Sequence, residues 1–329
     1  MRHRLQNLVW VILLGATLGG CQSDDADAVN PNRALFEEQQ QTITDFLEAQ
    51  DIATQQTSSG VRYRVLTENT GGPAPAPGNA IHLYYHIEQL DGSLVAELDS
   101  SKNDPVTYTF AYSGPNRTHV TLPRGLDGMV SLMREGEEYE FFLPSGLAYL
   151  DFELPGVIPA NAIVRARIYL DQVLTAAEQR RVEDQKIKEY LAAESLTGFD
   201  SLASGVYYAT TQAGDTSAQV TASSTVGVRY TGSLLDGTTF DSNTGANDKI
   251  YEVVMNDVSE RRPIEGFLTG IQQMSLGEKG TIIIPSHAAY GSGVVALPQS
   301  IVEDLLGPRA SSIPPFAILR FDVEVVTIK

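Results

Sequence analysis

The sequence predicts an α+β protein made of two similar domains, each an antiparallel β-sheet wrapped around a short α-helix. Three observations predict this fold class. The chain has 329 residues, of which 42% are hydrophobic, enough to build two domains with real cores. Long stretches of the sequence occur twice. Within each copy, strand-like segments and one helical segment are segregated rather than alternating as βαβ units.

The duplication is long and in register. "SSGVRYRV" at 58–65 matches "ASGVYYAT" at 203–210, displaced by 145 positions. A second match joins 125–149 to 266–290 without a gap, displaced by 141 positions. Matches of this length indicate a duplicated domain. We therefore divide the chain into these parts: 1–20, a lipoprotein signal peptide; 21–55, a lipidated cysteine, acidic tether and helix; 56–175, a first domain; 176–203, a connecting helix; and 204–329, a second domain.

The first element predicts export. Arg2 and Arg4 precede "LVWVILLGATLGG", an apolar run of 13 residues that is too short to span a bilayer. The run ends in "LGGC", which resembles the bacterial lipobox, and Cys21 is the only cysteine of the chain. A chance cysteine after an ordinary signal peptide is the less favoured alternative. We expect a protein of the bacterial cell envelope, lipid-anchored at Cys21 in the outer membrane, on either its periplasmic or its surface face.

Each domain is preceded by a predicted helix. Two apolar stripes at helical spacing predict them: Leu35, Phe36, Ile43, Phe46 and Leu47; and Val182, Ile187, Tyr190 and Leu191. The second helix begins with a capping box, Thr175 and Glu178, and carries Asp184 four residues before Lys188. We predict a solvated connecting helix, and a dimerisation arm is the alternative. The sequence leaves the oligomeric state open.

The second domain has the clearer pattern of elements. "VGVRYTGSLL" predicts a strand, "GTIIIP" a buried strand, and "FAILRFDVEVVTI" a long final strand. The segment "IEGFLTGIQQMS" predicts the short helix, because its apolar residues recur at helical spacing: Ile264, Phe267, Leu268, Ile271 and Met274. A sheet covered on one side by a helix leaves an opening at its edge where a ligand can bind.

One hairpin raises a question about two neighbouring residues. "RYTGSLLDGTTFDS" at 229–242 reads as two strands joined at Asp236-Gly237, yet neighbours on a strand point to opposite faces. Phe240 and Asp241 would then be directed apart. The first copy has "YYHIEQLDGSLVAELDSS" at 84–101, where we align Leu98 with Phe240 and Asp99 with Asp241.

Residues 204–329 resemble an FKBP-type peptidyl-prolyl cis-trans isomerase. Six motifs fall in the family's order: "VRYTG", "DGTTFDS", "PIEGFLTGIQQMSLGEK", "AYG", "IPP" and "LRFDVE". The resemblance implies isomerisation of X-Pro bonds without a cofactor, in proline-containing unfolded or exported polypeptides. It also implies a proline pocket with Pro263 and Ile264 on its rim, and with Phe240 as a wall where the chain bends out of its strand at Asp241. The lining is Tyr230, Phe240, Asp241, Phe267, Tyr290, Ile313 and Phe321.

The chemistry implied by this resemblance needs no acid–base constellation. Rotation about an X-Pro bond has a barrier of roughly 18–20 kcal/mol and involves neither proton transfer nor a covalent intermediate. An apolar pocket favours the twisted amide, which is less dipolar than the planar one. Hydrogen bonds from the Tyr290 hydroxyl and the Ile264 N–H would hold the substrate carbonyls, and Tyr230 would orient Asp241. The alternative for each aromatic residue is that it fills the core.

Other chemistries have little support in the sequence. His82 and His86 lie on a predicted strand, and we expect both to face solvent rather than bind a metal. His287 is expected to be a rim residue. The sequence has no Gly-rich phosphate loop and no G-x-S-x-G motif. A net charge of −18 disfavours binding to nucleic acid.

The first copy is a degraded version of the second. It keeps Tyr85, Asp99, Tyr149 and Ile158, but three pocket aromatics are replaced, by Leu98, Leu126 and Ala166, and Leu150 stands where glycine follows the tyrosine. We expect it to hold proline weakly and to serve binding, spacing or stability. The second copy carries 14 extra residues in the loop 292–312, either a decorated loop or a lid. Two functions follow: an isomerase acting through the second domain, or a non-catalytic peptide-binding or chaperone lipoprotein.

Overall fold

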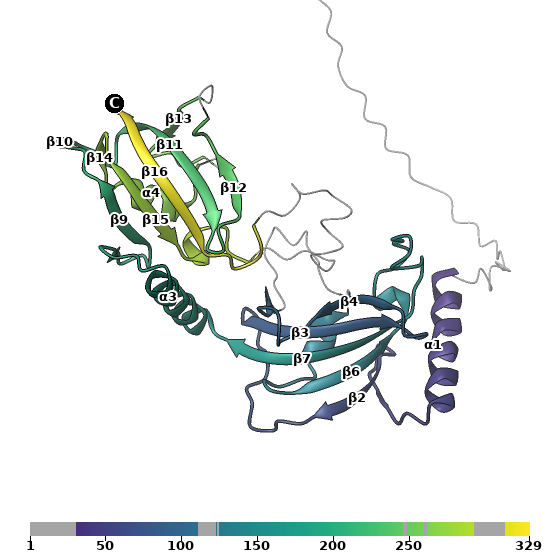
Figure 1. Cartoon of the computed structure of the whole chain (residues 1–329). Coiled ribbons are helices and arrows are strands. Elements are labelled where there is room, and N and C mark those ends of the chain that lie inside the picture. Colours follow the sequence, from purple (N-terminus) through teal and green to yellow (C-terminus); the bar gives the residue numbers. More distant parts are fainter. Residues whose placement is uncertain (1–30, 111–122, 124, 246–248, 260–261, 293–312) are drawn as a thin grey trace, which may run out of the picture.

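The computed structural model describes residues 31–110, 123, 125–245, 249–259, 262–292 and 313–329. Within these residues the chain forms two seven-stranded sheets, and all their strand pairs are antiparallel. Figure 1 shows the two sheets in separate parts of the molecule, with a helix between them. The predicted α+β class is confirmed.

The first sheet has the strand order β1-β2-β6-β7-β3-β4, with β5 paired to β3. The elements up to its last strand are α1 (Pro31–Ala49), β1 (Gln55–Gln56), β2 (Arg62–Thr67), β3 (Ala80–Gln89), β4 (Leu94–Leu98), β5 (Val106–Thr109), α2 (Leu126–Val130), β6 (Glu138–Leu143), the 3₁₀ turn η1 (Ser145–Leu147) and β7 (Val164–Leu174).

The second sheet has the order β12-β11-β16-β15-β9-β8, with β13 paired to β11, and β10 pairs separately with β14. The elements are α3 (Ala176–Ala193), β8 (Asp200–Ser201), β9 (Tyr207–Gln212), β10 (Asp215–Gln219), β11 (Thr225–Leu234), β12 (Thr239–Ser242), β13 (Tyr251–Val254), α4 (Glu265–Ile271), β14 (Ser275–Leu276), β15 (Lys279–Ile284), the 3₁₀ turn η2 (Ser286–Ala288) and β16 (Leu319–Ile328).

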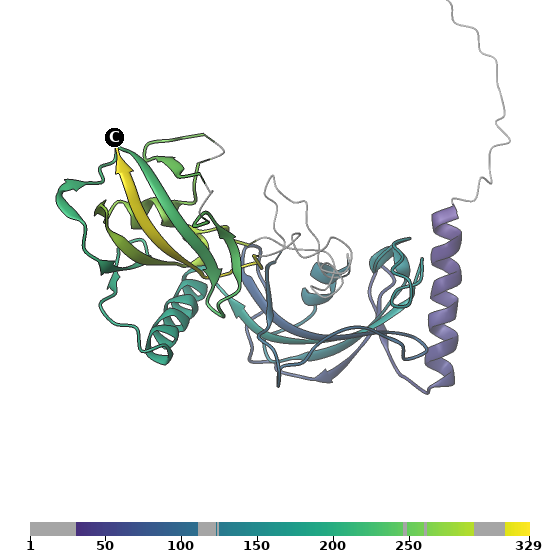
Figure 2. The same cartoon turned by 45° about the horizontal axis from the view of Figure 1, so that its top comes forward.

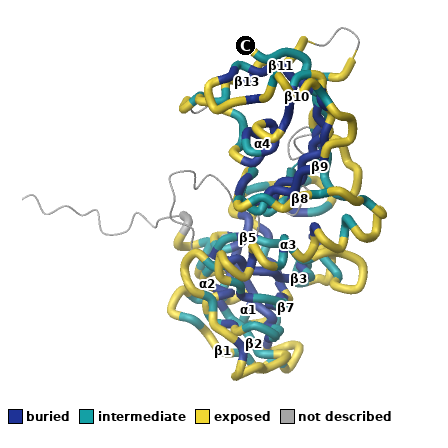
Figure 3. Tube along the Cα trace, turned by 90° about the vertical axis from the view of Figure 1, so that its left-hand side faces the viewer, coloured by how far each residue is buried: buried dark blue, intermediate teal, exposed yellow. Residues whose placement is uncertain are grey.

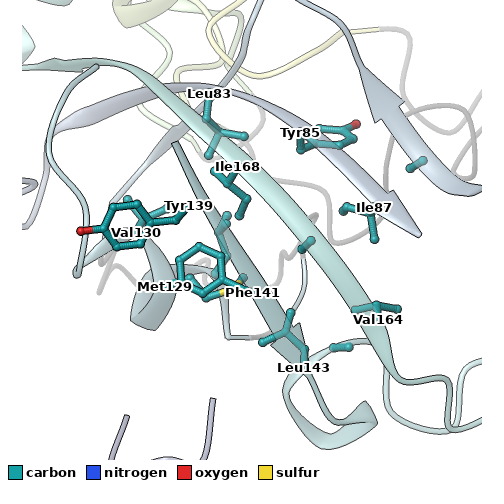
Figure 4. Packing of buried hydrophobic residues seen from close by; sticks show 14 of the residues in the cluster. Leu83, Tyr85, Ile87, Met129, Val130, Tyr139, Phe141, Leu143, Val164 and Ile168 are labelled. Atoms are coloured by element: carbon teal, nitrogen blue, oxygen red, sulfur yellow. The ribbon is translucent and has the colours of Figure 1, made fainter. Parts of the chain in front are cut away.

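Each sheet packs one face against its short helix. In the second core, Phe267, Leu268 and Ile271 of α4 are buried together with Ile282 and Ile284 of β15. The first core has the same plan, with Met129 and Val130 of α2 packed near Phe141 of β6 (Figure 4). Figure 3 shows that buried residues follow the strands, whereas exposed residues follow the connecting loops. These cores explain the apolar alternation in the strand sequences.

The opposite face of each sheet is covered by a longer helix. Ile43 of α1 packs against Phe142 of β6, and Ile187 of α3 packs against Ile283 of β15. Phe142 and Ile283 are separated by 141 positions, as in the sequence repeat, and Ile43 and Ile187 by 144. The two long helices therefore lie at equivalent places on the two sheets. Figures 1 and 2 show α1 beside the first sheet and α3 beside the second.

The α3 helix is less solvated than we predicted. Its capping box is confirmed: the Thr175 N–H donates to Glu178 over 2.8 Å, and the Glu178 N–H donates to the Thr175 hydroxyl over 3.3 Å. However, Gln179, Glu183 and Ile187 are all buried. The prediction of a solvated helix missed this face because two of its three buried side chains are polar.

The prediction that His82 faces solvent is wrong. His82 is only 4% exposed, and its Nε2 lies 3.0 Å from Oε1 of Gln179 on α3. His82 is on the face of β3 that points away from the core. In an isolated sheet this face would be exposed to solvent, but here α3 covers His82. Burial lowers the pKa of His82, although the bond to Gln179 opposes this shift. His86 is partly exposed, between Glu88 and Glu97.

Candidate active site

A β-bulge lies at Phe240, directly before Asp241. Gly232 of β11 pairs with Asp241 and Ser233 pairs with Thr239, so Phe240 is the extra residue of β12. An extra residue interrupts strict alternation and bends the strand. The strand nevertheless continues through Asp241 to Ser242, so the predicted exit from the strand at Asp241 is wrong. The bend comes one residue earlier, at Phe240.

Four aromatic rings meet beside this bulge. The ring of Phe321 on β16 lies 5.6 Å from that of Phe240 and 4.9 Å from that of Phe267 on α4. Tyr230 of β11 lies 5.7 Å from Phe267 and 5.9 Å from Phe321, measured between ring centroids. Phe267 and Phe321 are buried, whereas Tyr230 and Phe240 are partly exposed. The cluster therefore has a packed floor and an accessible edge.

Gly232 lets two of these rings approach the strand. A Cβ atom at this position would lie 2.7 Å from the ring of Phe240 and 2.9 Å from the ring of Phe321. Both distances are too short for carbon atoms in contact. A side chain at 232 would therefore displace both rings, and this explains the glycine within β11.

A carboxylate lies at the accessible edge. The Tyr230 hydroxyl donates to Oδ2 of Asp241 over 2.6 Å. Burial raises the pKa of Tyr230, and the hydrogen bond to Asp241 and its charge raise it further. Tyr230 therefore remains a neutral donor at ordinary pH and fixes the carboxylate. The predicted orientation of Asp241 by Tyr230 is present in the geometry.

Tyr251 of β13 is a further aromatic residue that the sequence analysis missed. Its ring lies 5.9 Å from that of Tyr230 in an edge-on arrangement, and the residue is 39% exposed. Burial raises the pKa of its hydroxyl, and the charge of Asp241 raises this pKa further. The available signal was the alternation of the short segment "YEVV", in which Val253 is buried. This segment lies outside the six motifs, so Tyr251 was overlooked.

The remaining predicted residues lie around the cluster. Ile264 and Ile313 are partly buried and pack against the second core, and Pro263 is also partly buried. Ile264 is the N-cap of α4, and its carbonyl accepts from the Phe267 N–H over 3.0 Å. Its own N–H has no backbone acceptor among the described residues.

Tyr290 is the most exposed of the predicted residues. It follows η2 and is 60% exposed, yet partial shielding of its hydroxyl raises its pKa, and the charges of Asp241 and Tyr251 act in the same direction. Among the described residues, no ring packs against it as closely as the four clustered rings pack together. His287 is exposed, and its Nε2 lies 3.0 Å from the Ser204 carbonyl.

The first domain shows that our alignment of its hairpin was wrong. Ile87 pairs with Ala96 and Glu88 with Leu94, so Val95 is the bulged residue. Val95 therefore occupies the place of Phe240, and Ala96 occupies that of Asp241. Leu98 and Asp99 lie beyond these positions, and only the local likeness of "LDS" to "FDS" suggested otherwise.

The acid that we aligned with Asp241 has a different role. Oδ2 of Asp99 lies 2.8 Å from the Lys102 ammonium, and this contact, with bonds from Ser101, lowers the pKa of Asp99 to about 2. The site of the first domain thus has alanine in place of the carboxylate. The strand pairing supports the other predicted equivalence, because Ala166 pairs with Ile87 as Phe321 pairs with Gly232.

Tyr149, which corresponds to Tyr290 in the sequence repeat, is buried. Tyr149 is 6% exposed, and its hydroxyl is buried without a hydrogen-bond partner among the described residues. Leu150, which stands in place of Gly291, has a φ of 59°, a conformation that costs a non-glycine residue roughly 1–2 kcal/mol. The first domain therefore has Val95 in place of the Phe240 wall and a buried tyrosine in place of Tyr290.

Among the residues that the structure describes, no group of three or more histidine, cysteine, aspartate or glutamate side chains is arranged to hold a metal ion. In the same part of the chain, no helix is long and apolar enough to cross a membrane.

Comparison with known proteins identifies a family that matches the second domain. The family of FKBP-type peptidyl-prolyl cis-trans isomerases matches residues 216–326. FkpA of Aeromonas hydrophila is 36% identical over 155 residues, 46% of this chain and 50% of that protein. The 22 kDa FKBP-type isomerase of Escherichia coli K12 is 30% identical over 169 residues, 51% of this chain and 66% of that protein. This chain therefore spans only half to two thirds of these two relatives.

A third relative is covered almost completely. FK506-binding protein 1 of Rhizopus delemar is 33% identical over 126 residues, which are 38% of this chain and 98% of that protein. The matched region of this chain contains the bulge, the aromatic cluster and the Tyr230–Asp241 pair. The chain belongs to the family of FKBP-type peptidyl-prolyl cis-trans isomerases.

Proposed function

We propose that this protein is a peptidyl-prolyl cis-trans isomerase whose activity lies in the second domain, 204–329. The observation that carries the proposal is the four-ring cluster of Tyr230, Phe240, Phe267 and Phe321, which is complete only there. The expected substrates are proline-containing unfolded or exported polypeptides, and no cofactor is required. The proposed pocket consists of the cluster with Asp241, Ile264, Tyr290 and Ile313.

The mechanism follows from a site that binds the twisted amide better than the planar one. A proline ring packed against Phe267 and Phe321 places the X-Pro bond in apolar surroundings. There the twisted amide, which is less dipolar, is stabilised relative to the planar states. The Ile264 N–H and the Tyr290 hydroxyl donate to the carbonyls on either side of the bond. Asp241, held by Tyr230, supplies a fixed negative charge at the edge. No proton has to be transferred.

Separate production of the two units tests where the activity lies. Residues 175–329 are expected to catalyse cis/trans exchange of a short X-Pro peptide, and residues 31–174 are expected to leave the uncatalysed rate unchanged. Each segment keeps the helix that covers its own sheet, so both retain their apolar contacts. Exchange is measured by NMR without a coupled protease. Equal activity of the two segments would contradict the assignment.

The alternative function is a non-catalytic peptide-binding or chaperone lipoprotein. The observation in its favour is the first domain, 56–175, in which the bulge carries Val95 and the tyrosine is buried. We propose that this domain serves binding, spacing or stability, and that 176–203 connects it to the second. An inactive second segment that still bound proline peptides would favour the alternative. The proposed lid, 292–312, lies outside the described residues except for Ser292.

We also propose that the protein is anchored in the bacterial outer membrane through lipid on Cys21. Cys21 and the signal peptide 1–20 lie outside the described residues. The support is the sequence "LGGC" and the position of α1, which begins ten residues after Cys21. Ten extended residues reach about 35 Å, enough to hold the first domain clear of lipid headgroups.

Replacement of the cysteine tests the anchor. Cys21→Ser is expected to release the protein from the membrane fraction with its thermal unfolding unchanged, because the tether separates the lipid from both cores. One acyl chain alone gives only marginal membrane binding, so loss of the lipidation site removes essentially all the affinity. Ser23→Ala is the matched control and should stay with the membrane. Retention of Cys21→Ser after a salt wash would refute the proposal.

A further inference from the structure

A buried serine stands at the start of the 3₁₀ turn that leads to Tyr149 in the first unit and to Tyr290 in the second. Ser145 opens η1 and Ser286 opens η2, and both are 3% exposed. Each of these serines donates hydrogen bonds to a side chain of the long helix on the outer face of its sheet. The two contacts are equivalent in position but differ in chemistry.

In the first unit the acceptor is an amide. Oε1 of Gln39 on α1 accepts from the Ser145 N–H over 2.8 Å and from the Ser145 hydroxyl over 3.0 Å. In the second unit it is a carboxylate. Glu183 of α3 accepts from the Ser286 N–H over 2.8 Å and from its hydroxyl over 2.6 Å. Glu183 is only 2% exposed, and buried charges persist only where hydrogen bonds compensate them.

The bonds of Ser286 reach both neighbours of Tyr290. The Ser286 carbonyl accepts from the Ala289 N–H and from the Gly291 N–H, each over 2.9 Å. The Gly291 carbonyl in turn accepts from the Phe316 N–H over 3.0 Å. Fixing Ser286 therefore fixes the backbone on both sides of Tyr290. Tyr290 itself is exposed and has little packing of its own to hold it.

The same carboxylate is connected to the first sheet. Nε2 of Gln179 donates to Oε1 of Glu183 over 2.9 Å, which turns the Gln179 oxygen toward Nε2 of His82, 3.0 Å away. His82 belongs to β3, and the three side chains are all buried. A continuous hydrogen-bonded chain thus runs from β3 of the first sheet to η2 of the second.

We propose that Glu183 is a positioning residue of the isomerase, which acts through Ser286 to hold Tyr290 at the pocket edge. This inference rests on the proposed function. Glu183 does not touch the substrate. The Gln179–His82 pair orients its carboxylate, so the first unit contributes to the site of the second.

The role is separable from the docking of α3. The helix is held on its sheet by apolar contacts of Ile187 with Tyr207 and Ile283, which do not involve Glu183. Loss of the carboxylate is therefore expected to loosen the turn rather than to release the helix. The first unit also shows that an amide oxygen alone can accept both bonds from the serine.

Kinetics of the full chain test the proposal. Glu183→Leu is expected to lower kcat/KM for an X-Pro peptide by about tenfold, the effect of losing hydrogen bonds to a charged group. Glu183→Gln is expected to keep most of the activity, because glutamine can reproduce the geometry of Gln39. Gln39→Leu is the matched control in the first unit and should leave the activity unchanged.

A double-mutant cycle identifies the route of the effect. If Glu183 acts through the tyrosine, Glu183→Leu should cause no further loss in a Tyr290→Phe background. Losses that multiply would overturn the proposal, as would full activity of a folded Glu183→Leu variant. An inactive wild-type protein would instead refute the proposed function.

Hydrogen exchange gives a readout that does not depend on activity. Glu183→Leu should speed amide exchange in 286–291 while β15 remains protected. Unchanged exchange in 286–291 would overturn the inference even if the protein proved not to be an isomerase. Should Glu183→Leu fail to fold, Ser286→Ala removes only the hydroxyl bond and is expected to show the same pattern more weakly. Unchanged exchange in that variant would likewise count against the proposal.

Discussion

Phe240→Ala is expected to lower kcat/KM by about tenfold or more, which corresponds to roughly 1.4 kcal/mol of transition-state stabilisation for each factor of ten. The ring of Phe240 packs edge-on against Phe321 at 5.6 Å and forms the accessible wall of the cluster. Its removal admits water to the place where the amide twists. Asp241→Ala, which leaves the apolar volume intact, is expected to cost less.

The comparison requires two folded variants. Circular dichroism and thermal unfolding establish this, because a large-to-small change in a packed site can itself cost roughly 3–5 kcal/mol. Val95→Ala, at the equivalent bulge of the first domain, is the matched control and should leave the activity unchanged. If Asp241→Ala proves the slower enzyme, desolvation is not the main contribution, and the carboxylate has a direct role at the twisting bond.

Glu140→Ala is expected to lower the free energy of unfolding of the first domain by about 3 kcal/mol. The Glu140 side chain is 1% exposed at the centre of β6, where it lies within 2.7 Å of Arg165 and also contacts Arg64. Removing the acid leaves these two guanidinium groups facing each other across the strand. Both arginines are partly exposed, so the cost lies at the lower end of the range for a broken buried pair.

Urea unfolding with a probe in the first domain measures this effect. Glu138→Ala is the control on the same strand, because Glu138 is 32% exposed and 3.9 Å from Arg167, and its loss should cost less than about 1 kcal/mol. Isomerase activity below the unfolding transition should be unchanged by either substitution. Equal costs for the two variants would show that the buried network contributes nothing beyond a surface pair.

The sequence could predict those features that depend on local patterns. A continuous apolar run predicted β15 as a buried strand, and apolar alternation predicted β16. Helical spacing predicted α4, and the Asp236-Gly237 pair predicted the hairpin turn. The capping box at Thr175 was also predictable, because its two hydrogen bonds involve residues three apart. Each of these signals lies within a few neighbouring residues.

Features that depend on contacts between distant elements could not be predicted in the same way. His82 was expected to be exposed, because it lies between the core residues Ile81 and Leu83 and so points away from the core. A helix almost a hundred residues later in the chain covers it. The register of β4 was misjudged because a bulge has no sequence signature of its own. Tyr251 was missed because only strand pairing brings it beside Tyr230.

The junction between the two units is a single residue. β7 ends at Leu174 and α3 begins at Ala176, so Thr175 alone separates the last strand of one sheet from the helix on which the other rests. One inserted residue at this point would rotate α3 by about 100° and advance it by about 1.5 Å. His82 and Ser286 could then no longer both meet the helix. The one-residue junction and the hydrogen bonds of Gln179 and Glu183 therefore depend on one another, because α3 has to keep a single orientation relative to β7 to contact both units.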